Sequence, residues 1–153
     1  MFGNTLSTAY ITIYFVATLV YGINHSDCGS TRALVHNVQV KGCDEVDLCP
    51  LIRNNSTELE ITFEVDSEVE NLKPVVKGDV NDNDFFLPFN NFPEKDACVR
   101  SGLACPLVPG QKYTYNSKIE VKNYYPPVKS NVKWQLKNGK DTILCVHIPS
   151  IIM

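Results

Sequence analysis

The sequence predicts an all-β fold, an antiparallel sandwich of two sheets with about seven short strands. Three observations support this prediction. Apolar and polar residues alternate with a period of two in several segments, and no segment keeps a 3.6-residue apolar period for three turns. Nine prolines and other turn residues separate these segments. With 153 residues, the chain has the length of one domain, since domains typically contain about 100 to 150 residues.

The composition excludes two classes of protein. Hydrophobic residues make up 44% of the chain and charged residues only 20%, which is too apolar for a disordered chain. The formal net charge is −3 and no basic stripe is present, so nucleic acid is not an expected partner.

The first residues predict export from the cell. Residues 9–21 form an uncharged, mostly apolar run, which is too short for a bilayer core that needs about 20 residues. Val20 and Gly22 are small residues at the positions that precede a signal-peptide cleavage site. We expect residues 1–22 to be a signal peptide, with an N-terminal anchor as the alternative, and residues 23–153 to be a secreted domain. In a secreted chain, Asn24, Asn54 and Asn55 head glycosylation sequons, and we expect one glycan at Asn54 or Asn55.

Five segments show the alternation of apolar and polar residues that is typical of a strand with one buried and one solvent-exposed face. Their apolar positions, in chain order, are Leu34, Val38 and Val40; Leu59, Ile61, Phe63 and Val65; Tyr113, Tyr115, Ile119 and Val121; Val132, Trp134 and Leu136; and Leu144, Val146 and Ile148. Asn138-Gly139 lies between the last two segments and is a strong signal for a hairpin turn.

Six cysteines in a small secreted chain indicate three disulfides rather than a zinc or redox site. Cys43 and Cys49 bracket a short loop, and so do Cys98 and Cys105, which leaves Cys28 and Cys145 to join the two ends of the domain. Six cysteines allow fifteen pairings, and loop geometry favours this one without excluding the others.

Several motifs resemble one known family. They are Asp27-Cys28-Gly29-Ser30, Cys49-Pro50-Leu51, the segment from Cys98 to Leu107, Tyr113-x-Tyr115, Tyr125-Pro126, the segment from Val132 to Leu136, and Cys145-x-x-Ile148-Pro149. Together, and with all six cysteines in register, they are similar to the Niemann-Pick type C-two sterol-transfer proteins of the lipid-recognition (ML) domain family. The match extends over the whole of residues 23–153.

The resemblance implies an immunoglobulin-like sandwich with these three disulfides and an apolar cavity between the sheets that holds a lipid. The family's lipid-binding positions correspond to Val40, Leu87, Phe89, Val121, Tyr125, Pro126 and Trp134. Strand parity alone gives Val40, Val121 and Trp134 a second interpretation, as ordinary core residues. Phe89, Tyr125 and Pro126 lie outside clean alternation and are candidates for the pocket mouth. We expect the ligand's hydroxyl or carboxyl group at the Phe89 and Tyr125 end.

The chain differs from the family in the segment before Phe89, where relatives have an apolar run rich in glycine and proline and this chain has an acidic one. Asp79, Asn81 and Asn83 have the spacing of the first three ligands of a calcium loop. The residues expected at the sixth and twelfth positions of such a loop are absent, so we interpret the segment as a solvated acidic loop beside an aromatic lip.

The sequence supports a carrier better than an enzyme. The three histidines form no metal or nucleophile motif, and His36, on the same parity as Val38 and Val40, is interpreted as a hydrogen-bonded strand histidine. We therefore expect a monomeric carrier without a cofactor or metal, holding a sterol, fatty acid or similar small lipid. Its partners would be membranes or a membrane lipid-transfer receptor, in extracellular fluid or the lysosome lumen. The alternative function is an extracellular lipid-sensing module, in innate immunity or semiochemical signalling, that acts on a receptor.

Overall fold

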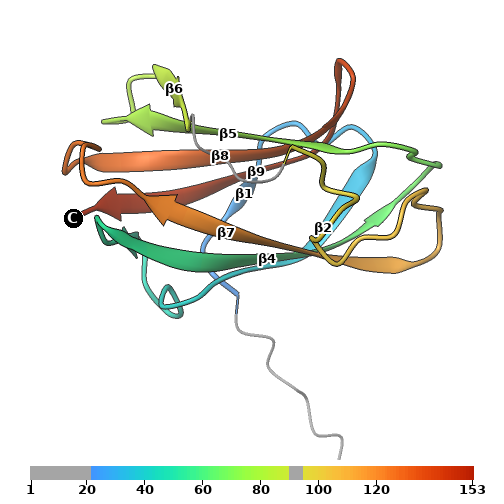
Figure 1. The fold of residues 1–153 in the computed structure, drawn as a ribbon, viewed down its shortest axis with the longest axis horizontal. Coiled ribbons are helices and arrows are strands. Elements are labelled where there is room, and N and C mark those ends of the chain that lie inside the picture. The colour runs from blue at the N-terminus through green and yellow to red at the C-terminus, as the bar shows by residue number, and fades with distance from the viewer. Residues whose placement is uncertain (1–21, 90–94) are drawn as a thin grey trace, which may run out of the picture.

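The computed structural model describes residues 22–89 and 95–153, which form nine β-strands and no helix. The strands are β1 (Ser26–Asp27), β2 (Ala33–Val40), β3 (Cys49–Leu51), β4 (Asn55–Val65), β5 (Lys73–Val80), β6 (Phe86–Pro88), β7 (Lys112–Val121), β8 (Lys129–Asn138) and β9 (Asp141–Ile152). They lie in two layers that face each other (Figure 1). In this described part of the chain, no helix is long and apolar enough to cross a membrane.

The larger sheet has the order β1-β9-β8-β5-β6, and the smaller sheet has the order β2-β4-β7. These pairings are antiparallel, so the predicted sandwich is confirmed. One pairing was not predicted. It is the parallel pairing of β3 with β9, in which Cys49 lies opposite Ser150. The strands outnumber the predicted set of about seven because β1, β3 and β6 are only two or three residues long.

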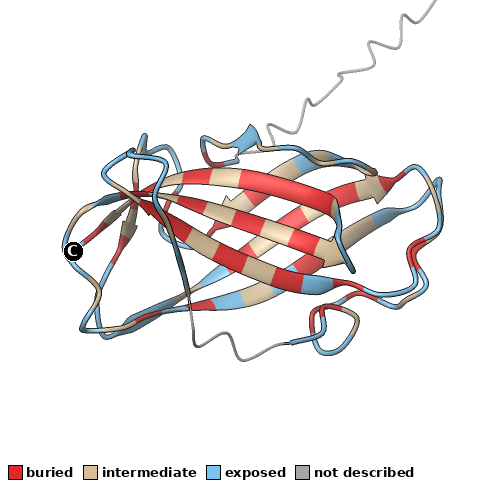
Figure 2. Cartoon of the chain, turned by 90° about the horizontal axis from the view of Figure 1, so that it is seen from above, coloured by how far each residue is buried: buried red, intermediate tan, exposed pale blue. Residues whose placement is uncertain are grey.

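The core lies between the two sheets and is built from alternate residues of each strand. In β4, Leu59, Ile61 and Phe63 are buried, and in β8 the buried residues include Trp134 and Leu136. Figure 2 shows this alternation of buried and less buried residues along the strands. Burying one large apolar side chain contributes roughly 1.5 to 3 kcal/mol, so the period of two is the main energetic reason for this arrangement.

One expected strand face is wrong. The register of β2 against β4 shifts between Val35 and Asn37, which is the signature of a β-bulge. The extra residue reverses the parity, so Val38 and Val40 are buried while Leu34 is 63% exposed. His36 lies in the bulge and is exposed rather than on the face of Val38 and Val40, and its Nε2 lies 3.2 Å from Oε1 of Glu64.

The hairpin predicted at Asn138-Gly139 joins β8 to β9. Asn138 pairs with Asp141, so the two turn residues are Gly139 and Lys140. Gly139 has a φ of 58°, which suits the first central position of a type II′ turn, where glycine avoids the Cβ clash of other residues. The turn is thus where the sequence indicated, with its centre one residue later.

The three predicted disulfides are confirmed. Cys28 is bonded to Cys145 across a sequence separation of 117, while Cys43–Cys49 and Cys98–Cys105 have separations of 6 and 7. The first bond therefore ties the start of the domain to its last strand. The other two bonds close surface loops.

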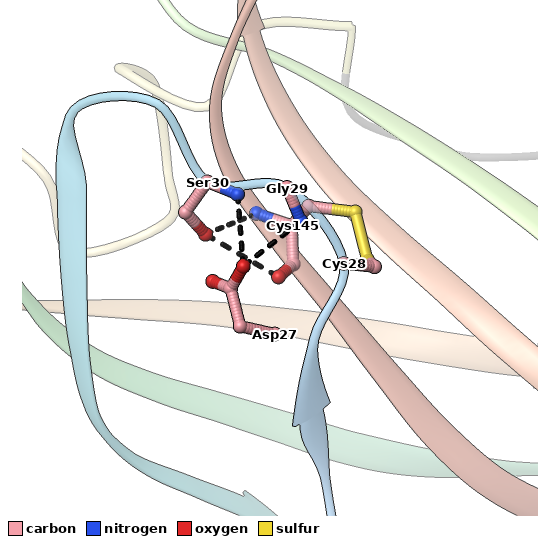
Figure 3. The surroundings of a disulfide bond; sticks show 5 residues. All are labelled: Asp27, Cys28, Gly29, Ser30 and Cys145. Carbon is pink, nitrogen blue, oxygen red and sulfur yellow. Dashed lines mark hydrogen bonds between the residues drawn. A yellow bond between two sulfur atoms is a disulfide. The ribbon is translucent and has the colours of Figure 1, made fainter.

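Polar groups organise the turn beside the long-range disulfide, as Figure 3 shows. Asp27 Oδ1 accepts hydrogen bonds from the backbone N–H groups of Gly29 and Ser30. The Ser30 hydroxyl accepts a bond from Cys145 N–H at 2.9 Å and donates to the carbonyl of the same residue. Partial burial acts to raise the pKa of Asp27, but the hydrogen bonds from Ser30 and Gly29 outweigh it and leave the pKa below its ordinary value. The Asp-Cys-Gly-Ser motif is therefore a capped turn that places Cys28 against β9.

Candidate functional site

An apolar pocket of about 290 Å³ opens at one end of the sandwich, where β5, β6, β8 and β9 meet the loop between β7 and β8. The residues that line it are Gly78, Val80, Leu87, Pro88, Phe89, Tyr124, Tyr125, Pro126, Val128, Ser130 and Ile152. None of these residues carries a charged side chain. The pocket can therefore bury apolar ligand surface without first removing water from an ion.

Four of the seven residues that the sequence analysis proposed for lipid binding meet at this pocket. They are Leu87, Phe89, Tyr125 and Pro126. Leu87 belongs to β6, and Phe89 follows directly after that strand, while Tyr125 and Pro126 come from the loop between β7 and β8. The structure thus brings two segments that are distant in the sequence together at one pocket.

Aromatic rings form the lip of the pocket. The Phe89 and Tyr125 rings meet edge to face, with centroids 5.2 Å apart, and Tyr124 contacts Tyr125 in the same way at 5.0 Å. Burial and the neighbouring Tyr124 raise the pKa of the Tyr125 hydroxyl above its ordinary value. The Tyr125 hydroxyl therefore stays neutral at physiological pH.

A capped turn between β5 and β6 positions one side of this lip. Asp79 is only 4% exposed, and its carboxylate oxygens accept hydrogen bonds from the N–H groups of Asp84 and Phe85 at 3.3 and 3.2 Å. Asn81 and Asp82 have positive φ values of 58° and 51°, a conformation that Asn and Asp adopt more readily than most residues. The acidic segment is thus a defined turn.

The calcium-loop alternative finds no support in this geometry. The Asp79 carboxylate is engaged by backbone N–H groups, and the side-chain amide of Asn83 donates to the carbonyl of Val80. Within residues 22–89 and 95–153, no group of three or more His, Cys, Asp and Glu side chains is placed to hold a metal ion.

Gly78 allows Phe89 to lie close to β5. The backbone N–H of Phe89 donates to the carbonyl of Val76 at 3.0 Å, which extends the pairing of this segment with β5. A Cβ atom on Gly78 would lie 3.0 Å from the Phe89 ring and 2.9 Å from Ser130 Oγ. Real Cβ contacts are almost never this short, so any side chain at position 78 would displace one of these neighbours.

The other three proposed residues lie in the core. Val40, Val121 and Trp134 are 1%, 3% and 0% exposed and belong to the buried cluster between the sheets. None of them lines the pocket. Phe89 and Tyr125 pack against the same cluster, so the core is continuous with the floor of the pocket.

Sequence reasoning missed several residues of the pocket. Gly78 and Val80 were missed because β5 itself was not predicted. Ser130 could have been found, since it shares the inward parity of Val132 and Trp134, where a polar residue is unusual. Ile152 was overlooked because the alternation was followed only to Ile148.

Beside the lip, the Phe86 side chain contacts a histidine. The ring of Phe86 stacks on His147, with centroids 6.0 Å apart and planes 20° apart, and Lys133 Nζ lies 5.1 Å from the centre of the Phe86 ring. Burial lowers the pKa of His147, the positive charge of Lys133 lowers it further, and Asp79 and Asp84 act in the opposite direction. The net pKa lies below the ordinary value for histidine.

The sequons lie on the surface of the domain. Asn24, Asn54 and Asn55 are all exposed. Asn54 has a φ of 60° in the turn before β4, and its N–H donates to the carbonyl of Val121. The predicted signal peptide lies outside the described residues except for Gly22.

Known proteins resemble this chain along most of its length. The NPC intracellular cholesterol transporter 2 homolog a of Drosophila melanogaster is 37% identical over 148 residues, which cover 94% of this chain and 97% of the fly protein. The NPC intracellular cholesterol transporter 2 of Bos taurus is 32% identical over 146 residues, covering 94% of this chain and 95% of the bovine protein. A crystal structure of a Niemann-Pick type C2 protein from the Japanese carpenter ant superposes with a TM-score of 0.76 at 25% identity, covering 88% of this chain and all of the ant chain.

A family match agrees with these similarities. The family model described as the ML domain matches residues 22–152, which include every strand of the sandwich, the three disulfides and the pocket. The sequence motifs, the fold and the relatives thus lead to one assignment. This chain belongs to the ML-domain family.

Proposed function

We propose that this protein is a secreted carrier that binds one sterol or fatty-acid-like lipid in the apolar pocket. It delivers the lipid through transient contact with a membrane or a membrane lipid-transfer receptor. The observation that carries the proposal is the uncharged pocket with its aromatic lip. Family membership agrees with a role that is not enzymatic, and the names of the fly and bovine relatives support a sterol as cargo.

The physical basis of binding is the unfilled apolar surface of the pocket. A cavity loses the contact energy of its lining atoms, and a lipid that fills it recovers this energy. A ligand of ~20 to 28 heavy atoms at roughly 0.3 kcal/mol per atom gains about 6 to 8 kcal/mol, which corresponds to dissociation constants from tens of micromolar to about one micromolar.

The test replaces one wall of the pocket. Phe89→Ala removes an aromatic side chain worth about 2 kcal/mol, so affinity for a fluorescent sterol or fatty acid should fall about thirtyfold. Phe85→Ala is the matched control, because Phe85 is 63% exposed and does not line the pocket. Fluorescence titration of both folded variants measures the difference. Equal affinities of the parent and both variants would show that the lipid binds elsewhere.

Secretion and cargo are tested on protein from its natural source. Mass spectrometry of the intact secreted protein should show a chain that begins at Ile23 and carries a glycan at Asn54 or Asn55. Under native conditions the same measurement should show one bound lipid, which solvent extraction then identifies.

Delivery is expected to depend on the charge of the membrane. Lys122 and Lys129 flank the loop that carries Tyr125 and Pro126, although Lys122 also pairs with Glu120. Anionic vesicles should therefore accelerate lipid transfer over neutral vesicles, and added salt should reduce this advantage. The transfer rate of a fluorescent sterol between vesicles checks this. A rate that is insensitive to both salt and vesicle charge contradicts electrostatic docking.

A further inference from the structure

Ser130 is a polar residue on the inward face of the larger sheet. It is the second residue of β8, where it pairs with Val80 of β5 and with Ser150 of β9. The residue is 4% exposed and lines the pocket. Its neighbours on the same face of β8 are Val132 and Trp134, so a hydroxyl stands where the pattern of the strand calls for an apolar side chain.

The hydroxyl of Ser130 differs from those of the other buried serines. Ser101 donates to the carbonyl of Ala97, and Ser150 donates to the carbonyl of Ile148 at 3.0 Å. Among residues 22–89 and 95–153, the structure gives Ser130 Oγ no such acceptor. Ser130 Oγ is also not one of the fully buried side-chain atoms of the described residues that lack a partner, so it keeps contact with the pocket, from which water or a ligand can supply its hydrogen bond.

Gly78 leaves this hydroxyl uncovered on the side of the lip. Ser130 Oγ and the Phe89 ring both lie within 3.0 Å of the point that a Cβ on Gly78 would occupy. Any larger residue at position 78 would therefore cover Oγ. Because the residue is glycine, Oγ is not covered from position 78 and stays open to the pocket that both residues line.

The chemistry of the pocket limits the polar group that can bind there. None of the lining residues is charged, so an ionised carboxylate inside the pocket would lose its water without gaining a cation. A neutral hydroxyl loses less, and it can both donate to and accept from a serine hydroxyl.

We infer that the pocket selects a neutral lipid with a single hydroxyl group and that Ser130 is the residue that binds this hydroxyl. The inference rests on the proposed function and narrows it, because it favours alcohols such as sterols over free fatty acids. It also names Ser130 as a specificity-determining residue of the site.

The test compares three ligands that differ only in their polar end: dodecane, dodecanol and dodecanoate. Each displaces phenylnaphthylamine, a neutral fluorescent dye, from the intact protein at neutral pH. In Ser130→Ala, the ratio of dodecanol affinity to dodecane affinity should fall about five- to tenfold relative to the parent, the equivalent of one hydrogen bond. Both affinities are measured on the same protein, so their ratio cancels any effect of the substitution on folding. In the parent, dodecanoate should bind at least about tenfold more weakly than dodecanol.

Two further variants complete the design. Ser150→Ala removes a buried hydroxyl that is already satisfied and is not in the lining, so its affinity ratio should match the parent. Gly78→Ala keeps the Ser130 hydroxyl but places a methyl group over it, so its ratio should fall in the same direction as in Ser130→Ala.

The outcomes separate the two proposals. A parental ratio in both Ser130→Ala and Gly78→Ala overturns the role of Ser130, and equal binding of dodecanoate and dodecanol by the parent overturns the selection of a neutral lipid. If the parent binds none of the three ligands, dodecane included, the proposed lipid-carrier function itself fails.

Discussion

The His147 side chain, which stacks on Phe86 beside the lip, makes the stability of the fold depend on pH. Its folded pKa lies below the ordinary value, because burial and Lys133 oppose the charged form more than Asp79 and Asp84 support it. The unfolded chain therefore binds a proton at higher pH than the folded chain does. The contribution of this residue is fully present above about pH 6.5 and is lost as the pH falls from there through the lower folded pKa.

We predict that His147→Gln reduces the acid sensitivity of the fold. The free energy of unfolding, measured by urea titration between neutral and mildly acidic pH, should fall less steeply with acidification in the variant than in the parent. Lys137→Gln, on the same outer face of β8 but nearer the hairpin, is the control and should keep the parental slope. Identical slopes for the parent and His147→Gln would show that His147 does not contribute to the acid sensitivity of the fold.

The alternation along a strand correctly predicts which side chains point toward the core, except where a β-bulge interrupts the strand. Val40, Val121 and Trp134 point inward as their spacing indicates. Leu34 fails, because a bulge is set by backbone pairing with β4, and no residue in the run from Leu34 to Asn37 signals it. The four mouth residues were identified by family resemblance and loop position, and parity gave no information about them.

Among the long strands, β5 is the one that the alternation of the sequence did not predict. Its inward positions are Pro74, Val76, Gly78 and Val80, so only two of the four carry a large apolar side chain. Its outward positions include Val75 and the buried carboxylate of Asp79. The alternation is therefore weak, although the backbone pairs with β8 over all eight residues. Tertiary contacts, rather than local pattern, determine this strand.

The turn between β5 and β6 is expected to control the shape of the mouth. Asp79→Ala removes the acceptor of two backbone N–H groups in a buried position, which should destabilise the domain by about 1 to 3 kcal/mol. Because the turn positions Leu87 and Phe89, lipid affinity should also fall, and amide hydrogen exchange should increase in residues 81–87.

Asp44→Ala is the matched control for this prediction, since it removes the same charge from an exposed loop on another part of the domain. Unfolding curves, lipid titration and hydrogen exchange of both variants check the outcome. Unchanged exchange in the turn of Asp79→Ala would mean that the carboxylate does not organise it.

On the scale of the whole molecule, the disulfides should differ in their effects. In the chain-entropy model, the bond between Cys28 and Cys145 restricts a loop of 117 residues and contributes about 4 to 5 kcal/mol, while Cys98–Cys105 contributes about 2 kcal/mol. Replacing each pair with serines should therefore lower the free energy of unfolding about twice as much for the first pair. Chemical denaturation of both double variants measures this difference, and equal losses would contradict the entropic account.

The global architecture was more predictable than the connections within it. Six cysteines, period-two alternation and turn residues were enough for a disulfide-bonded sandwich, because each reflects a local rule. The parallel pairing of β3 with β9 was not predictable in the same way. It joins Pro50 to Ile151 across about a hundred residues, and three residues are too few to show a period.

The long strands that border the smaller sheet are covered by other segments. The N–H of Ile23 donates to the carbonyl of Val38 in β2, and the N–H of Asn116 in β7 donates to the carbonyl of Ser101. The larger sheet ends in β1 and β6, which are too short to template another strand. Edge-to-edge aggregation is thus discouraged at both sheets, and the exposed Phe85, Leu87 and Tyr124 around the mouth offer a different surface through which two copies could associate. We predict that a dimer formed through these side chains would close the pocket, so dilution should favour the loading of lipid.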